Sequence, residues 1–70
     1  MIEVKINTEI IKLDSFLKWC GAASQGSEAK IYIQNGEVKV NGEIETRRGK
    51  KITYGDEVEF NGEIYTVIKP

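Results

Sequence analysis

Residues 36–42 read GEVKVNG, and this segment determines how the chain around it is interpreted. Its two valines alternate with charged residues, which is the period-two pattern of a half-buried strand. Asn41-Gly42 ends the segment, and an Asn-Gly pair between alternating runs is the strongest short signal for a β-hairpin. A second such pattern, residues 58–62, is followed by the segment IYTVI at 64–68. The second half of the chain is therefore predicted to form two hairpins, separated by a turn at Tyr54-Gly55-Asp56.

Ahead of this segment the hydrophobic period is that of a helix. Apolar residues at i, i+3, i+4 and i+7 share one helical face, and they are Leu13, Phe16, Leu17 and Cys20. Gly21 is predicted to end this helix, and Asp14 near its start is interpreted as a capping or framework residue. Trp19 lies at the edge of the apolar stripe. We expect it to pack in the core, and stacking on an unpaired base is the alternative.

A second helix is predicted after a short break. Ser24 or Ser27 is expected to cap its start, and Asn35-Gly36 is expected to end it, because both residue types tolerate the left-handed conformation. Residues 2–6 alternate apolar and polar side chains and predict a short strand ahead of both helices. The predicted fold class is α+β: a two-helix hairpin over residues 12–35, packed on a small, mostly antiparallel sheet with Asn-Gly hairpins.

The composition predicts a small binding domain without catalytic chemistry. Seventy residues make one domain, 1–70, with a thin core. No apolar run approaches the roughly 20 residues that cross a bilayer, and a single cysteine cannot form an internal disulfide, which predicts a cytoplasmic chain. The sequence has no histidine, so it offers neither a histidine base nor a histidine metal ligand. We therefore expect a monomer with no enzymatic activity, no metal and no cofactor.

Charge is distributed unevenly along the chain. The formal net charge is −1, yet residues 12–51 carry eight basic and five acidic groups, and both ends are acidic. On charge alone, an ordinary solvated surface explains this modest excess better than a binding site does. The sharper feature is residues 47–51, RRGKK, where four cations surround a glycine that lets a phosphate approach the backbone closely. Arginine can bind phosphate through two parallel N–H groups, and lysine supplies a point charge.

The order of these elements resembles the S-four-type RNA-binding domain (the αL motif), named after ribosomal small-subunit protein four. The matching segments, all within residues 10–60, are KLDSFL at 12–17, SEAK at 27–30, GEVKVNG at 36–42, RRGKKI at 47–52 and GDEV at 55–58. The chain length is similar to that of the small stand-alone bacterial members of the YaaA/YbcJ type. In this family the two helices and the following loop form a basic surface that grips folded RNA. The resemblance implies a non-enzymatic protein that binds structured RNA, with ribosomal RNA or a ribosome precursor as its partner.

The charge pattern and the resemblance together define the candidate RNA-binding residues. Many family members carry an arginine at the start of the first helix and another just before the second, where this chain has Lys12 and Gln25-Gly26. This difference lowers the positive charge on the helical part of the site, so the loop 47–51 is expected to make the larger contribution to binding. The candidate residues are Lys12, Lys18, Ser27, Lys30, Lys39, Arg47, Arg48, Lys50 and Lys51.

Two other classes of function stay open at this point. The hairpin and Gly-Asp segments also resemble ubiquitin-like (β-grasp) sulfur carriers. Those proteins need a C-terminal Gly-Gly that can be thiocarboxylated, whereas this chain ends Ile68-Lys69-Pro70, and their fold has one main helix. The other alternative is a protein-binding adaptor that uses an exposed sheet edge.

Overall fold

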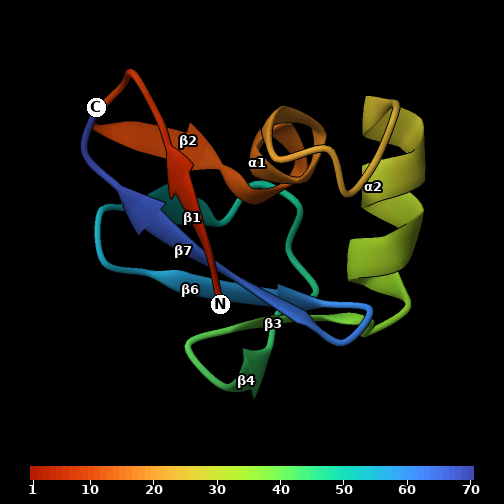
Figure 1. The fold of residues 1–70 in the computed structure, drawn as a ribbon. Coiled ribbons are helices and arrows are strands. Elements are labelled where there is room, and N and C mark those ends of the chain that lie inside the picture. Colours follow the sequence, from red (N-terminus) through yellow and green to blue (C-terminus); the bar gives the residue numbers. More distant parts are fainter.

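The computed structural model describes residues 1–70 as two helices packed against one face of a sheet (Figure 1). The elements are β1 (Ile2–Lys5), β2 (Ile10–Lys12), α1 (Leu13–Trp19), α2 (Gly26–Gln34), β3 (Val38–Val40), β4 (Glu43–Ile44), β5 (Lys51–Thr53), β6 (Glu57–Phe60) and β7 (Glu63–Ile68). Five strands form one sheet in the order β1-β7-β6-β3-β4, and β2 and β5 form a separate ribbon. Only β1 and β7 run parallel. The predicted α+β class and the mostly antiparallel sheet are confirmed.

Both Asn-Gly pairs form tight hairpin turns, as predicted. Asn41-Gly42 has φ values of 52° and 85°, and Asn61-Gly62 has values of 55° and 82°. Positive φ at both central residues defines the turn type whose twist matches that of the flanking strands. The first turn is also tied to the second hairpin, because the Asn41 side chain accepts the Glu57 N–H at 2.9 Å and donates to the Asp56 carboxylate at 3.1 Å. The Asn-Gly and Gly-Asp segments therefore hold each other in place.

The β2–β5 ribbon is a feature that the sequence pattern does not indicate. Each strand has three residues, too few for a period of two to stand out, and the strands lie about forty residues apart in the chain. Ile11 pairs with Ile52, which is fully buried, and Lys12 pairs with Lys51. The ribbon therefore carries the chain into α1 and attaches the basic loop beside it.

The core consists of apolar side chains contributed by both layers. Its twelve buried residues are Ile6, Leu13, Phe16, Leu17, Ala23, Ala29, Ile33, Val38, Val40, Ile52, Val58 and Val67. Phe16 meets Tyr65 edge to face, with ring centroids 6.5 Å apart, and this contact joins α1 to β7. Cys20 is half-buried against the core, as predicted, and desolvation raises the pKa of its thiol. The predicted apolar face of the first helix is thus confirmed.

Two local predictions are wrong. Ser24 does not cap α2, because the helix begins at Gly26 with Gln25 as its N-cap residue and without a side-chain cap. The Ser24 hydroxyl instead donates to the Glu28 carboxylate at 3.1 Å. Ser27 lies inside the first turn and does not cap it either. Trp19 is not a core residue, because 53% of its surface is exposed.

Neither helix has the length and apolar character that crossing a bilayer requires.

Candidate nucleic-acid interface

The basic loop is built onto the start of α1 through its main chain. The Leu13 N–H donates to the Lys50 carbonyl at 2.8 Å, and the Asp14 N–H donates to the Arg48 carbonyl at 3.1 Å. The Ser15 N–H is accepted by the Asp14 carboxylate at 2.8 Å, which gives Asp14 the framework role predicted from the sequence. The first N–H groups of a helix have no hydrogen-bond acceptor within the helix. Here the carbonyl groups of the loop act as those acceptors. The backbone of the loop is therefore fixed, while its side chains remain available.

Four cations gather at this junction, and we call them the loop–helix cluster: Lys12, Arg48, Lys50 and Lys51. Lys12 and Lys51 are directly opposite each other in the β2–β5 ribbon, and both are exposed. Like charges in this position destabilise a strand pair. The one ion pair of the structure lies elsewhere, between Glu45 and Arg47. None of the four cations of the cluster therefore forms an ion pair with an acidic side chain.

Arg47, the fourth cation of the loop, is occupied by an acidic neighbour that sequence reasoning missed. Its Nε donates to Glu45 Oε2 at 2.9 Å and its Nη2 donates to Glu45 Oε1 at 3.0 Å. The Arg47 N–H adds a third bond to the same carboxylate at 3.0 Å. These bonds to Arg47, helped by the charges of Arg47 and Lys50, lower the pKa of Glu45 to about 2. The only available sequence signal was an acidic residue two positions before the arginine.

An open hollow of about 460 Å³ lies over the loop and is lined by Arg47, Gly49, Lys50 and Lys51. A β-carbon at position 49 would meet no protein atom within 4 Å, and Gly49 does not have positive φ. Neither packing nor backbone geometry therefore demands a glycine at this position. The missing side chain instead leaves the cationic hollow open to a group that enters from solvent.

The helical candidates form a second group at the start of α2. The stem of Lys18 crosses from α1 to α2, because a β-carbon at position 26 would lie 3.9 Å from Lys18 Cδ. Ser27 and Lys30 are three residues apart and occupy neighbouring positions on α2. No protein acceptor receives the N–H groups of the first three residues of α2. The start of α2 therefore has unpaired donors, unlike the start of α1. Lys18, Ser27 and the acidic Glu28 lie beside it, and Lys30 follows about one turn along the helix.

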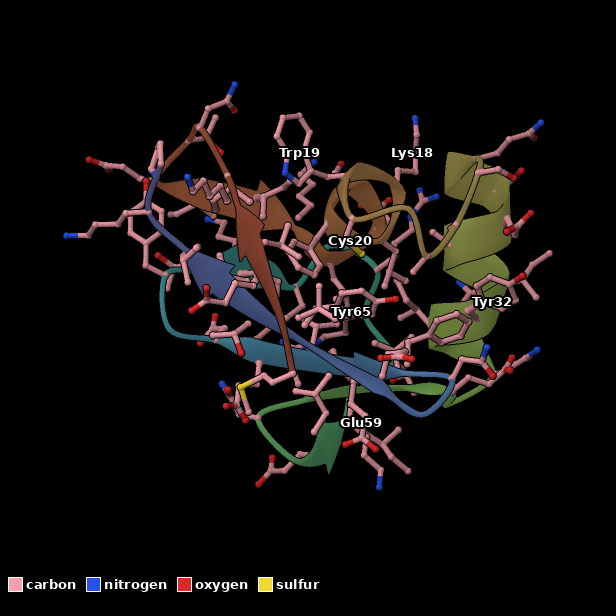
Figure 2. All side chains as sticks on the ribbon, viewed as in Figure 1. Lys18, Trp19, Cys20, Tyr32, Glu59 and Tyr65 are labelled. Carbon is pink, nitrogen blue, oxygen red and sulfur yellow. The ribbon has the colours of Figure 1, made fainter.

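Lys39 lies apart from both groups. It is exposed between two buried valines on β3, so it points to the face of the sheet that the helices do not cover. Its cross-strand neighbours are Ile44 on β4 and Glu59 on β6. Figure 2 shows Glu59 on the side of the sheet opposite the helices. The structure thus attaches the loop–helix cluster to the start of α1, places the helical candidates on the helix pair, and leaves Lys39 on the face of the sheet that the helices do not cover.

A two-helix hairpin with a cationic loop fixed at its first helix, packed on hairpin-linked strands, is the arrangement of an αL-motif domain. The sequence pattern of the S4 domain matches residues 4–68, which is nearly the whole chain. This chain belongs to the S4 domain family.

Individual relatives agree with this assignment. The chain is 42% identical over 59 residues to the probable ribosome maturation protein RlbA of Bacillus subtilis, covering 84% of this chain and 83% of that protein. It is 41% identical over 58 residues to the putative RNA-binding protein YbcJ of Escherichia coli, covering 83% of each. The solution structure of E. coli YbcJ, described as revealing an αL motif involved in RNA binding, superposes with a TM-score of 0.73 at 36% identity. That superposition covers 97% of this chain and 87% of YbcJ.

Proposed function

We propose that this protein binds structured RNA, specifically ribosomal RNA or a ribosome precursor, as a monomer and without catalysing a reaction. The observation that carries the proposal is the attachment of the loop backbone to the start of α1, which gathers the loop–helix cluster on one side of the molecule. Membership of the S4 domain family supports it, as do the names of the relatives, one of which is a probable ribosome maturation protein. We infer that residues 1–70 act as one RNA-binding unit.

The mechanism is electrostatic. RNA phosphates enter the open hollow and approach the loop–helix cluster, and their charge relieves the repulsion between Lys12 and Lys51. The open start of α2, with Lys18 and Lys30 beside it, provides a second phosphate contact. Duplex RNA hides its base edges in a deep and narrow groove, so this surface recognises the spacing of phosphates rather than base sequence.

The net charge of −1 does not oppose this mechanism, because the two sides of the molecule differ. Glu57 and Glu59 lie on β6, and Glu59 points away from the helices (Figure 2). Acidic groups on the sheet side leave the cationic side intact, and they orient the molecule as it approaches a polyanion.

The first test is a titration of fluorescently labelled RNA with this protein, followed by anisotropy at low and at physiological salt. A structured ribosomal RNA fragment and a simple hairpin of equal length are compared. We expect salt-sensitive binding of both, because phosphate contacts release counterions, and tighter binding of the ribosomal fragment. Absence of binding at low salt would contradict the proposal and would favour a protein-binding adaptor.

Glu45→Gln tests whether the ion pair with Glu45 keeps Arg47 from contacting RNA. This substitution removes the carboxylate that occupies Arg47, so the arginine becomes available to a phosphate. We expect tighter RNA binding and a plot of log K against log salt that is steeper by up to about 0.9, the value for one added phosphate contact. Glu43→Gln is the matched control, because Glu43 is exposed nearby and forms no ion pair. Equal effects of the two substitutions would show that net charge alone, rather than release of Arg47, governs binding.

A further inference from the structure

Trp19 is the one aromatic side chain that the fold leaves exposed. The other five are half-buried or buried and are engaged in the interior: Phe16 with Tyr65, Tyr32 with Phe60, and Tyr54 against the core. Trp19 is 53% exposed. Single exposed apolar residues are common on protein surfaces, so exposure alone indicates no function. The geometry that holds this side chain is more informative.

The indole ring is fixed in its exposed position. Its Nε1–H donates to the main-chain carbonyl of Lys5 at 2.6 Å, a contact between α1 and the end of β1. The ring therefore cannot turn freely on the surface, and its only hydrogen-bond donor is already used. What remains for a ligand is the flat π surface. A ring that is fixed before binding avoids much of the entropy loss that immobilising a side chain entails.

The ring lies on the same side of the molecule as Lys18, one of the candidate RNA-binding residues (Figure 2). Figure 2 shows Trp19 and Lys18 both projecting from α1 away from the sheet, and Glu59 on the opposite side. The loop–helix cluster is at the start of α1 and Trp19 is at its end. Seven helical residues separate these points by about 10 Å. Phosphates of one strand are spaced about 3.4 Å along the axis of a B-DNA duplex, so a distance of this size corresponds to only a few nucleotides.

We propose that Trp19 is a stacking platform for one unpaired nucleobase of an RNA whose phosphates are held by the loop–helix cluster. This inference rests on the proposed RNA-binding function and adds a ligand class to it. Bases inside a continuous duplex are not accessible to the ring, whereas a base in a bulge or junction is. Stacking uses the π face, which every base has, so Trp19 selects unpaired nucleotides without selecting their sequence.

The test uses two RNA duplexes of identical sequence, one of which carries an added three-nucleotide bulge. Because the chain has one tryptophan, fluorescence excited at the red edge of the absorption band, where its tyrosines do not absorb, reports on Trp19 alone. We expect the bulged RNA to quench this fluorescence and the fully paired RNA to leave it nearly unchanged. By anisotropy of labelled RNA, Trp19→Ala should weaken binding of the bulged RNA by about 5- to 150-fold, the equivalent of the about 1–3 kcal/mol that one stacked base contributes. It should barely affect binding of the paired RNA.

Trp19→Phe is the control for a merely structural role. Both variants lose the hydrogen bond to Lys5, but phenylalanine keeps an aromatic face. Phenylalanine should therefore retain most of the preference for the bulged RNA. Equal losses in the two variants, or unchanged fluorescence at saturation with the bulged RNA, would overturn the stacking inference and leave RNA binding standing. Failure of the wild-type protein to bind either duplex would overturn the proposed function as well.

Discussion

Replacing Arg48, Lys50 and Lys51 together with glutamine is expected to weaken binding of structured RNA by about 100- to 1000-fold. A net contribution of about 1–1.5 kcal/mol for each of three solvent-exposed contacts gives a loss of this size. The slope of log K against log salt should become shallower by about 2 to 3, since about 0.9 is lost for each phosphate contact. The fold should be retained, because the loop contributes carbonyl groups to α1 and glutamine supplies the same carbonyls. Anisotropy titrations over a salt series, with circular dichroism of the free variant, measure both effects.

A matched control separates a local site from net charge. Lys39 and Lys69 lie outside the proposed interface, and Lys39→Gln combined with Lys69→Glu changes the net charge by the same amount. We expect this control variant to bind RNA within a few-fold of the wild type. If it loses as much affinity as the loop variant does, the proposed location of the interface is wrong. Because this variant lacks Lys39, binding close to that of the wild type would also show that Lys39, one of the residues predicted from the sequence, makes no RNA contact.

Phe16→Ala should remove most of the stability of the protein. Phe16 is fully buried and joins α1 to β7 through Tyr65. Truncation of a buried phenylalanine costs about 3–5 kcal/mol, and a protein of this length has about 4–10 kcal/mol of stability in total. Urea unfolding followed by circular dichroism should show a midpoint far below that of the wild type, or no folded baseline at all.

Ile31→Ala is the comparison for the same measurement. Ile31 is 57% exposed on α2, so its truncation leaves no cavity and should change the free energy of unfolding by less than about 0.5 kcal/mol. A loss below about 1 kcal/mol for Phe16→Ala would mean that the contact between α1 and β7 contributes little to stability. The helix pair would then be anchored by Leu13 and Leu17 instead.

The parts of the fold that local chemistry determines were predictable from the sequence. The apolar stripe of α1 is one example, and the Asn-Gly turns are another, because positive φ strongly restricts which residues fit. The β2–β5 ribbon was not predictable, since its two three-residue strands are distant in the chain and their pairing depends on tertiary structure. Trp19 illustrates the same limit. Its helical position suggested the core, but its hydrogen-bond partner, the Lys5 carbonyl, comes from a strand that sequence spacing does not bring near.

The candidate site was predictable in composition but not in arrangement. Sequence reasoning chose the cations of the loop and the helices without knowing that Lys12 and Lys51 face each other across a ribbon. It also treated Arg47 as equivalent to Arg48, whereas Glu45 engages only Arg47 through its side chain. Alternation along β3 correctly predicted that Lys39 is exposed. It could not show which side of the sheet the helices cover.

The attachment of α1 to the carbonyls of Arg48 and Lys50 has a consequence for how such a protein can change over evolutionary time. Every amino acid has a main-chain carbonyl, so the helix start does not depend on which side chains the loop carries. Substitutions at these positions can therefore alter affinity, or the choice between one RNA and another, with little penalty to folding. The residues that stabilise the fold and the side chains that contact RNA can therefore change independently of each other. The same property makes the loop a suitable place to introduce randomised side chains when selecting variants for new RNA targets.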